Sequence, residues 1–109
     1  MNALTLLRAS SFWQRLTGLH TYSGLSSMTG LWLSPCRAIH TLGLSYPIDV
    51  LYLDRQQKII KRLDALAPNR VSVCWAAYSV VELPAGFCTK HPDYPDQLAL
   101  ALLSPKILV

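Results

Sequence analysis

The chain has 109 residues, of which 51% are hydrophobic and 15% are charged. This length suits one domain with one core, and this composition excludes a disordered chain. The formal net charge is +4, and the one local group of cations comprises Arg55, Lys58, Lys61 and Arg62. Nucleic-acid-binding domains carry a denser basic stripe, so this charge argues against a nucleic-acid partner.

The first third of the chain carries few decisive patterns. Residues 3–9, "ALTLLRA", alternate too poorly to favour either strand or helix. Ser10 or Ser11 is placed to cap a helix through "FWQRLTG", which Gly18 would end. The Gly-, Ser- and Thr-rich residues 18–30 predict a loop, and the short apolar run Leu31–Ser34 predicts a strand that Pro35 stops.

The middle of the chain predicts a β-hairpin. Residues 46–54, "YPIDVLYLD", place apolar side chains on both faces of a strand, which indicates a central strand. The polar "DRQQ" supplies a turn, and "KIIKRLDAL" follows as an antiparallel partner, at least over Lys58–Leu63. We expect Val50, Leu51, Tyr52 and Leu53 to be buried.

The last third predicts a strand near Tyr78–Leu83, ended by Pro84 and Gly86, and then a helical turn in "GFCTKH". Residues 97–103, "QLALALL", alternate and predict a final strand. Many short strands with little helix predict an α+β fold, a compact, mainly antiparallel β-sheet or barrel-like domain with short helices. Residues 1–109 are expected to form this single domain.

Two further patterns bear on location and redox state. The N-terminal residues lack the layout of a signal peptide, and no apolar run reaches the ~18 residues of a membrane span. A soluble, cytoplasmic protein without a transmembrane segment is therefore expected. Three cysteines, Cys36, Cys74 and Cys88, form no disulfide framework and predict reduced, mostly buried thiols.

A series of landmarks runs along most of the chain, from about Ala9 to about Leu100. These landmarks are Arg15-x-x-Gly18-Leu19, Leu31-Trp32-Leu33, Pro35-Cys36-Arg37-x-Ile39-His40-Thr41, "PIDVLYLD" at 47–54, Pro68 and "VELPAG" at 81–86. Their order resembles the bacterial and archaeal family called domain of unknown function 192. The resemblance implies a small β-rich, barrel-like domain with short helices and no established activity.

One position departs from that family's pattern. Family members tend to carry a Gly-Asp turn before the last strand, whereas this chain has Pro95 in the place of the Gly and keeps the acid as Asp96. Proline cannot adopt a positive φ. We therefore expect a different local turn here.

The stretch "PCRAIHT" at 35–41 places Cys36 four residues before His40. On extended backbone this spacing separates the two side chains by about 13 Å, so Cys36 is not expected to be a nucleophile with His40 as its base. The possible zinc ligands are Cys36, His40, Cys74, Cys88 and His91. Their spacings do not match a zinc module, and we expect no metal and no cofactor.

Asp49 and Glu82 lie inside otherwise apolar strands, where a carboxylate is costly unless it is paired or exposed. Two interpretations stay open: a structural ion pair at a sheet corner, or a shared polar pocket. The candidate residues are His40, Thr41, Asp49, Glu82 and Arg37.

The predicted function is a non-enzymatic binding or accessory module that engages a small ligand or a protein partner of unknown identity. The alternative is a hydrolase-like enzyme that uses His40 with Asp49 or Glu82. The alternative requires these three side chains to converge in one cleft.

Overall fold

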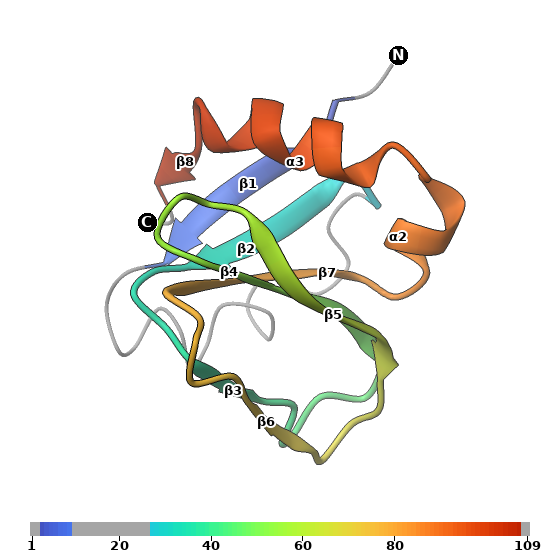
Figure 1. Ribbon diagram of the computed structural model, residues 1–109. Coiled ribbons are helices and arrows are strands. Elements are labelled where there is room, and N and C mark those ends of the chain that lie inside the picture. The colour runs from blue at the N-terminus through green and yellow to red at the C-terminus, as the bar shows by residue number, and fades with distance from the viewer. Residues whose placement is uncertain (1–2, 10–26, 108–109) are drawn as a thin grey trace.

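Six strands form the main sheet, in the order β5-β4-β7-β2-β1-β8. The computed structural model describes residues 3–9 and 27–107 (Figure 1). The strands of this sheet are β1 (Thr5–Ala9), β2 (Thr29–Leu33), β4 (Ile48–Leu53), β5 (Ile59–Leu66), β7 (Ser79–Pro84) and β8 (Lys106–Ile107). Strand β1 pairs in parallel with β2 and β8, and the other pairs are antiparallel. The described strands thus form an open mixed sheet with β5 and β8 at its edges, in a β-rich α+β fold, and the barrel-like form is not confirmed.

The predicted hairpin is confirmed. Strand β4 pairs with β5 on one side and with β7 on the other, and all six of its residues are buried. This central position explains why both of its faces are apolar. The register shifts where Ile48 pairs with Leu66 and Val50 pairs with Leu63, so that one residue of β4 faces two of β5. Such a bulge leaves an extra backbone N–H free to bond elsewhere.

Alternation along the strands divides the core between the two faces of the sheet. The first cluster includes Leu51, Leu53, Val81 and Leu83, and it packs against Leu98 and Leu102. The second cluster includes Ile48, Val50, Tyr52 and Val80, and it packs against Ile39, Leu44 and Ala77. Adjacent strand residues point to opposite faces, which produces this division.

Two helices follow β7. Helix α2 (Phe87–Lys90) confirms the predicted helical turn. The predicted strand over residues 97–103 is wrong, because these residues belong largely to helix α3 (Tyr94–Leu102). Leu98 and Leu102, four residues apart, share the buried side, while Leu100 is 69% exposed. Pro95 stands in the first turn, where its missing N–H costs nothing.

A two-stranded ribbon, β3 (Ala38–His40) with β6 (Val71–Val73), lies at the end of the molecule opposite α3 (Figure 1). Tyr52 of the main sheet contacts it through a hydrogen bond of 2.9 Å between its hydroxyl and that of Ser72. The extended backbone at β3 agrees with the expectation that Cys36 and His40 do not share a helix.

The remaining predictions concern strands β2 and β7, the first thirty residues and membrane-spanning helices. Strand β2 confirms the predicted strand but begins two residues earlier, and β7 confirms the strand near Tyr78–Leu83. The undecided residues 3–9 contain β1. The predicted helix through residues 12–18 and most of the predicted loop at 18–30 lie outside the described residues. Among the helices that are described, none approaches the length needed to cross a membrane.

Candidate functional site

The sheet separates the two buried acids. In the antiparallel pairing of β4 with β7, Asp49 faces Leu83 and Val50 faces Glu82. Directly paired residues point to the same face and neighbours along a strand alternate. The Asp49 side chain therefore lies on the face of α3, and the Glu82 side chain lies on the face of the ribbon.

Asp49 is fully buried, and its carboxylate accepts three backbone hydrogen bonds. Oδ1 accepts from the N–H of Ala65 at 2.9 Å and of Gly86 at 3.1 Å, and Oδ2 accepts from the N–H of Cys88 at 3.1 Å. The bulge in β5 supplies the first donor. Gly86 supplies the second with φ at 83°, a conformation that glycine adopts readily. Asp49 thus joins β4, β5 and the start of α2.

Glu82 is buried on the opposite face, between Leu31 of β2 and Val50 of β4. Within the described part of the chain, no hydrogen bond or ion pair to its carboxylate is formed. Burial raises the pKa of Glu82 to about 8, so this group is largely protonated near neutral pH. The pKa of Tyr46 is raised as well, first by burial and then by the negative charge of Glu82.

The other three predicted residues have separate positions. The Thr41 hydroxyl donates to the carbonyl of Ala67 at 2.7 Å and accepts from the N–H of Arg70 at 2.8 Å. Arg37 donates through Nε to the carbonyl of Ala77 at 3.1 Å. His40 is exposed on β3. The structure therefore does not bring the five candidates together at one point.

A second cluster joins Asp49, Asp64 and Cys88, whose ligand-type atoms all lie within 4.8 Å of one another. Its chemistry does not suit a metal. The Asp49 carboxylate already accepts three hydrogen bonds. Burial, and then the charge of Asp49, raise the pKa of the Cys88 thiol to about 12, whereas a metal needs the thiolate. Asp64 pairs with Arg62 through two bonds, of 2.6 and 2.9 Å, which lower the pKa of Asp64.

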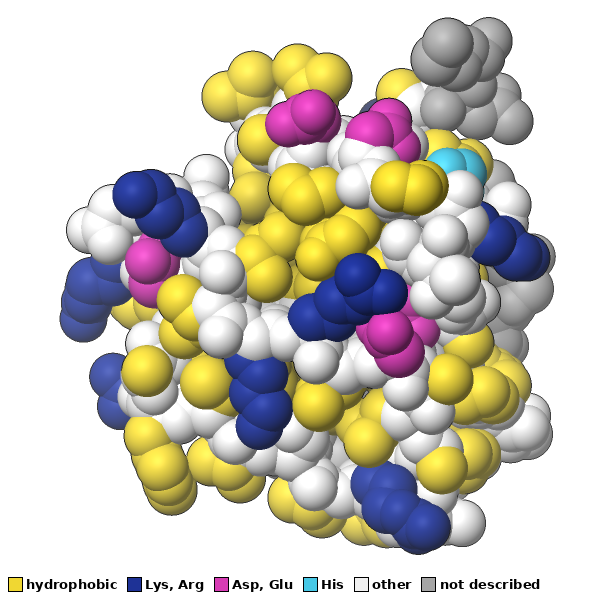
Figure 2. All heavy atoms as spheres, turned by 45° about the vertical axis from the view of Figure 1, so that its right-hand side comes forward, with side chains coloured by type: hydrophobic (Ala, Val, Ile, Leu, Met, Phe, Trp, Pro, Cys, Tyr) yellow, Lys and Arg dark blue, Asp and Glu magenta, His cyan; other side chains and the backbone are white. Residues whose placement is uncertain are grey.

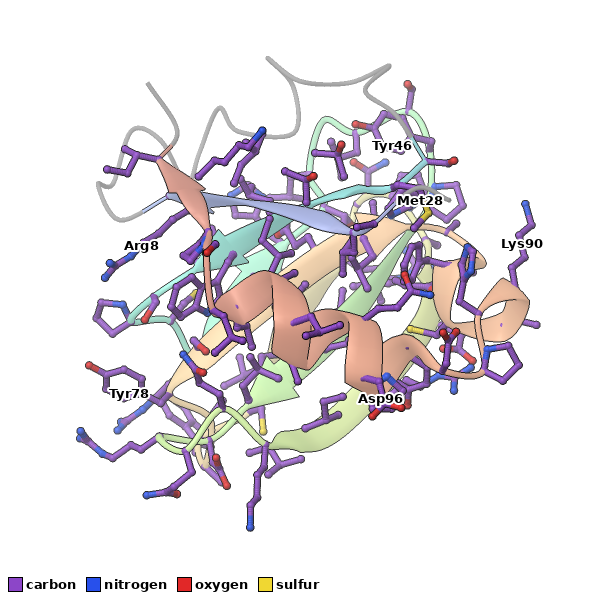
Figure 3. All side chains as sticks on the ribbon, turned by 90° about the horizontal axis from the view of Figure 1, so that it is seen from above. Arg8, Met28, Tyr46, Tyr78, Lys90 and Asp96 are labelled. Carbon is purple, nitrogen blue, oxygen red and sulfur yellow. The ribbon has the colours of Figure 1, made fainter. Side chains whose placement is uncertain are left out.

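A groove of about 810 Å³ lies between α3 and the first strand. Its apolar lining comprises Ala3, Leu4, Leu6, Met28, Leu100 and Ala101. Its polar lining comprises Thr5, Ser27, His91, Asp93, Asp96, Gln97, Ser104 and Lys106. Seen from above in Figure 3, Met28 lies near the start of β1 and Asp96 lies on α3. Exposed Leu100 extends the apolar surface of the groove outward.

Gln97 has an unusual position in this lining. Its Nε2 donates to Oδ1 of Asp93 at 3.0 Å, and its Oε1 is buried without a hydrogen-bond partner among the described residues. A carboxylate near neutral pH only accepts, so the amide nitrogen must be the atom that faces Asp93. The oxygen is therefore the unpaired atom by chemistry as well as by geometry. A buried acceptor without a partner costs about 1–3 kcal/mol, which a bound donor would recover.

The sequence did not predict this groove, because the alternation of residues 97–103 indicated a strand and not a helix. One signal was available: Asp93 and Gln97 are four residues apart, and on a helix they form a hydrogen-bonding pair. The cavity itself depends on how α3 packs, which the sequence does not specify.

Comparison with known proteins places the fold in context. A sequence model of the family DUF192, described as "Uncharacterized ACR", matches residues 2–93. No curated protein matches the chain in sequence. A crystal structure of a protein of unknown function from Novosphingobium aromaticivorans is similar at a TM-score of 0.70 and 13% identity, over 80% of this chain and 67% of that one. A "putative transcription regulator" from Sinorhizobium meliloti is similar at 0.73 and 19% identity, over 82% and 74%. At these identities the likeness concerns the fold alone.

Proposed function

The chain belongs to the DUF192 family, and on that premise we propose that it is a non-enzymatic binding module that holds a small ligand in the groove between α3 and β1. The groove volume of about 810 Å³ falls within the range of roughly 300–1,000 Å³ that small-molecule sites occupy. The groove lining combines apolar side chains with polar groups that can fix the orientation of a ligand, as small-molecule sites do.

The single observation that carries the proposal is the buried, unpaired Oε1 of Gln97, a residue of the groove lining. Nearly all buried polar atoms in folded proteins have a hydrogen-bond partner. A buried acceptor without one, on a residue that lines a groove, therefore indicates a donor from outside the chain. Asp93 holds the amide in this orientation through the bond to Nε2. The acceptor is thus fixed in place before a ligand arrives, which lowers the entropy cost of binding.

The lining indicates the class of ligand. The apolar side chains suit an apolar body, and Gln97 accepts a hydrogen bond from the head group. Asp93 and Asp96 add two acidic side chains to the same lining, while Lys106 and His91 are its basic members. We therefore expect a head group that donates hydrogen bonds, such as an amine, to bind better than a carboxylate, which only accepts.

The alternative, a hydrolase-like enzyme, lacks this support. It requires His40, Asp49 and Glu82 in one cleft, but Asp49 and Glu82 lie on opposite faces of the sheet. His40 is exposed on the ribbon, and the Asp49 oxygens accept hydrogen bonds from backbone donors. A general base must lie within reach of its substrate, whereas Asp49 is fully buried and its oxygens are held by three backbone donors.

The test uses three probes with the same six-carbon body: hexylamine, hexan-1-ol and hexanoate. Each is titrated into the ¹⁵N-labelled full chain while the backbone amide signals are followed. We expect hexylamine and hexanol to shift the signals of residues 3–6 and 96–104, with hexanoate the weakest. Shifts confined to other regions, or no preference for donor head groups, would contradict the proposal.

A matched control separates the groove from general apolar binding. Leu103 is 78% exposed and does not line the groove, whereas Leu100 is 69% exposed and lines it. Replacing Leu100 with Ser should weaken hexylamine binding, and Leu103→Ser should leave it unchanged. Equal effects of the two variants would indicate a non-specific apolar surface.

A further inference from the structure

We propose a second binding surface, on the ribbon, which takes an acidic segment of a partner protein. The surface, called the ribbon face here, comprises Ala38, His40, Leu42, Val71, Val73 and Trp75. It is independent of the α3 groove, since the ribbon lies at the opposite end of the molecule (Figure 1). In Figure 2 hydrophobic side chains stand at the lower margin of the molecule, the end at which the ribbon lies.

The ribbon face arises from the register of β3 with β6. Ala38 pairs with Val73 and His40 pairs with Val71, so these four side chains share one face. That face is exposed, while Ile39 points inward and is buried. The alternation of β6 is therefore reversed: its valines face solvent, and its serine faces Tyr52. A solvated ribbon would place the polar residue outside.

Two large apolar side chains just beyond the strands are exposed as well. Trp75 follows β6 and is 79% exposed, and Leu42 follows β3 and is 51% exposed. The N–H of Thr41 donates to the carbonyl of Arg70 at 2.8 Å, which holds the residues before Leu42 and Val71 side by side. A highly exposed tryptophan close in the chain to exposed valines is typical of an anchor residue in protein interfaces.

The charges around the ribbon face indicate the partner. Residues 35–48 and 66–78 contain Arg37 and Arg70 but no Asp or Glu. Neither arginine forms an ion pair within residues 3–9 and 27–107; Arg37 bonds to the Ala77 carbonyl and Arg70 to the Asn69 carbonyl. An acidic segment with an apolar or aromatic side chain would complement both features.

Three other occupants fit less well. A second copy would bring two acid-free, arginine-bearing surfaces together, which like charges disfavour. Proteins that bind single-stranded nucleic acid use several aromatic side chains, on which the bases stack, along a strongly basic groove. This face offers one exposed tryptophan and two arginines. An anionic membrane surface is bound most firmly by clusters of four to eight cations.

The test pans a phage library of random 12-residue peptides against the full chain. Enriched peptides are then synthesised and their Kd values are measured by fluorescence anisotropy. We expect an excess of Asp and Glu around an apolar residue. Binding should fall about tenfold or more for Trp75→Ala and for Arg70→Glu, and it should not change for Leu103→Ala, an equally exposed position far from the ribbon.

Several results would overturn this inference while leaving the groove proposal intact. These are enriched peptides without an acidic excess, equal binding to the wild type and to Trp75→Ala, or a concentration-dependent dimer that Trp75→Ala abolishes in sedimentation. The inference is also overturned if no acidic peptide is enriched while phosphatidylglycerol vesicles or the oligonucleotide dT12 bind in a way that depends on Trp75. Trp75 is largely exposed, so its replacement should leave folding unaffected, which thermal melts will verify.

Discussion

Asp49 and Glu82 lie one register step apart on neighbouring strands, and their side chains occupy opposite faces of the sheet. The two acids consequently have different environments. Asp49 accepts three backbone N–H bonds, whereas Glu82 is buried among apolar neighbours with a pKa of about 8. One acid stabilises the junction of three elements, and the other is a source of pH dependence.

Replacing Asp49 with Asn should destabilise the fold strongly. The new amide nitrogen must face at least one backbone N–H, so a buried donor loses its partner and the charge-assisted bonds are lost. We expect a loss of about 2–4 kcal/mol in the free energy of unfolding, measured by urea denaturation. Asp64→Asn, at an exposed acid that pairs with Arg62, is the control and should cost much less. Equal losses would show that the Asp49 network is not structural.

Glu82 predicts a loss of stability as the pH rises. Its pKa is raised from 4.5 to about 8 in the folded protein, so between these values the folded state binds more protons than the unfolded chain. Stability from this group is therefore full below about pH 4.5 and is lost as the pH rises through 8. At about 1.4 kcal/mol per pKa unit, the total is on the order of a few kcal/mol.

The Glu82→Gln variant isolates this effect, because glutamine has nearly the same shape and does not titrate. Relative to the wild type, the variant should become progressively more stable between pH 5 and pH 9, as measured by urea denaturation at each pH. A constant difference across this range would mean that Glu82 is ionised in the folded protein or paired with a cation.

The thiol of Cys88 should resist alkylation. Its pKa of about 12 leaves almost no thiolate at pH 8, and the side chain is buried. Cys36 and Cys74 are only half-buried, and the Cys36 thiol donates to the carbonyl of Ala38 at 3.0 Å. Iodoacetamide at pH 8, followed by peptide mass spectrometry, should label the half-buried Cys36 and Cys74 before Cys88. Rapid, selective labelling of Cys36 would instead reveal an activated nucleophile.

The cluster of Asp49, Asp64 and Cys88 should hold no stoichiometric metal. Metal binding would require loss of the Cys88 proton and of backbone bonds to Asp49. Elemental analysis of protein purified without chelator should find far less than one zinc per chain. A near-stoichiometric content, with a melting temperature that falls on chelation, would refute this expectation.

The sequence was most informative where one interaction dominates. The hairpin of β4 and β5 followed from an apolar run, a polar turn and a second run, and tertiary packing agreed with all three. Helix α3 was missed because its Leu and Ala residues alternate, which suggests a strand, although Leu98 and Leu102 also have the helical spacing of four residues. Pro95 was the better signal, since proline is favoured in the first turn of a helix.

The candidate site was harder to predict for a physical reason. Sequence identified Asp49 and Glu82 as costly buried acids, and both are buried. Their placement on opposite faces depends on the strand order, which puts β7 next to β4, and on the register, which pairs Asp49 with Leu83 and Val50 with Glu82. The position of the groove depends on where α3 packs against the sheet. In the sequence, only the four-residue spacing from Asp93 pointed to Gln97.

The central claim is that Gln97 accepts a hydrogen bond from a ligand in the α3 groove. The most direct test is the Kd of hexylamine for the wild type and for Gln97→Met, measured by NMR titration. Methionine has a similar length and helix propensity but lacks the acceptor. We expect the Kd to rise about tenfold, since a hydrogen bond to a charged donor contributes about 1.5–3 kcal/mol. An unchanged Kd, with the fold intact, would contradict the account.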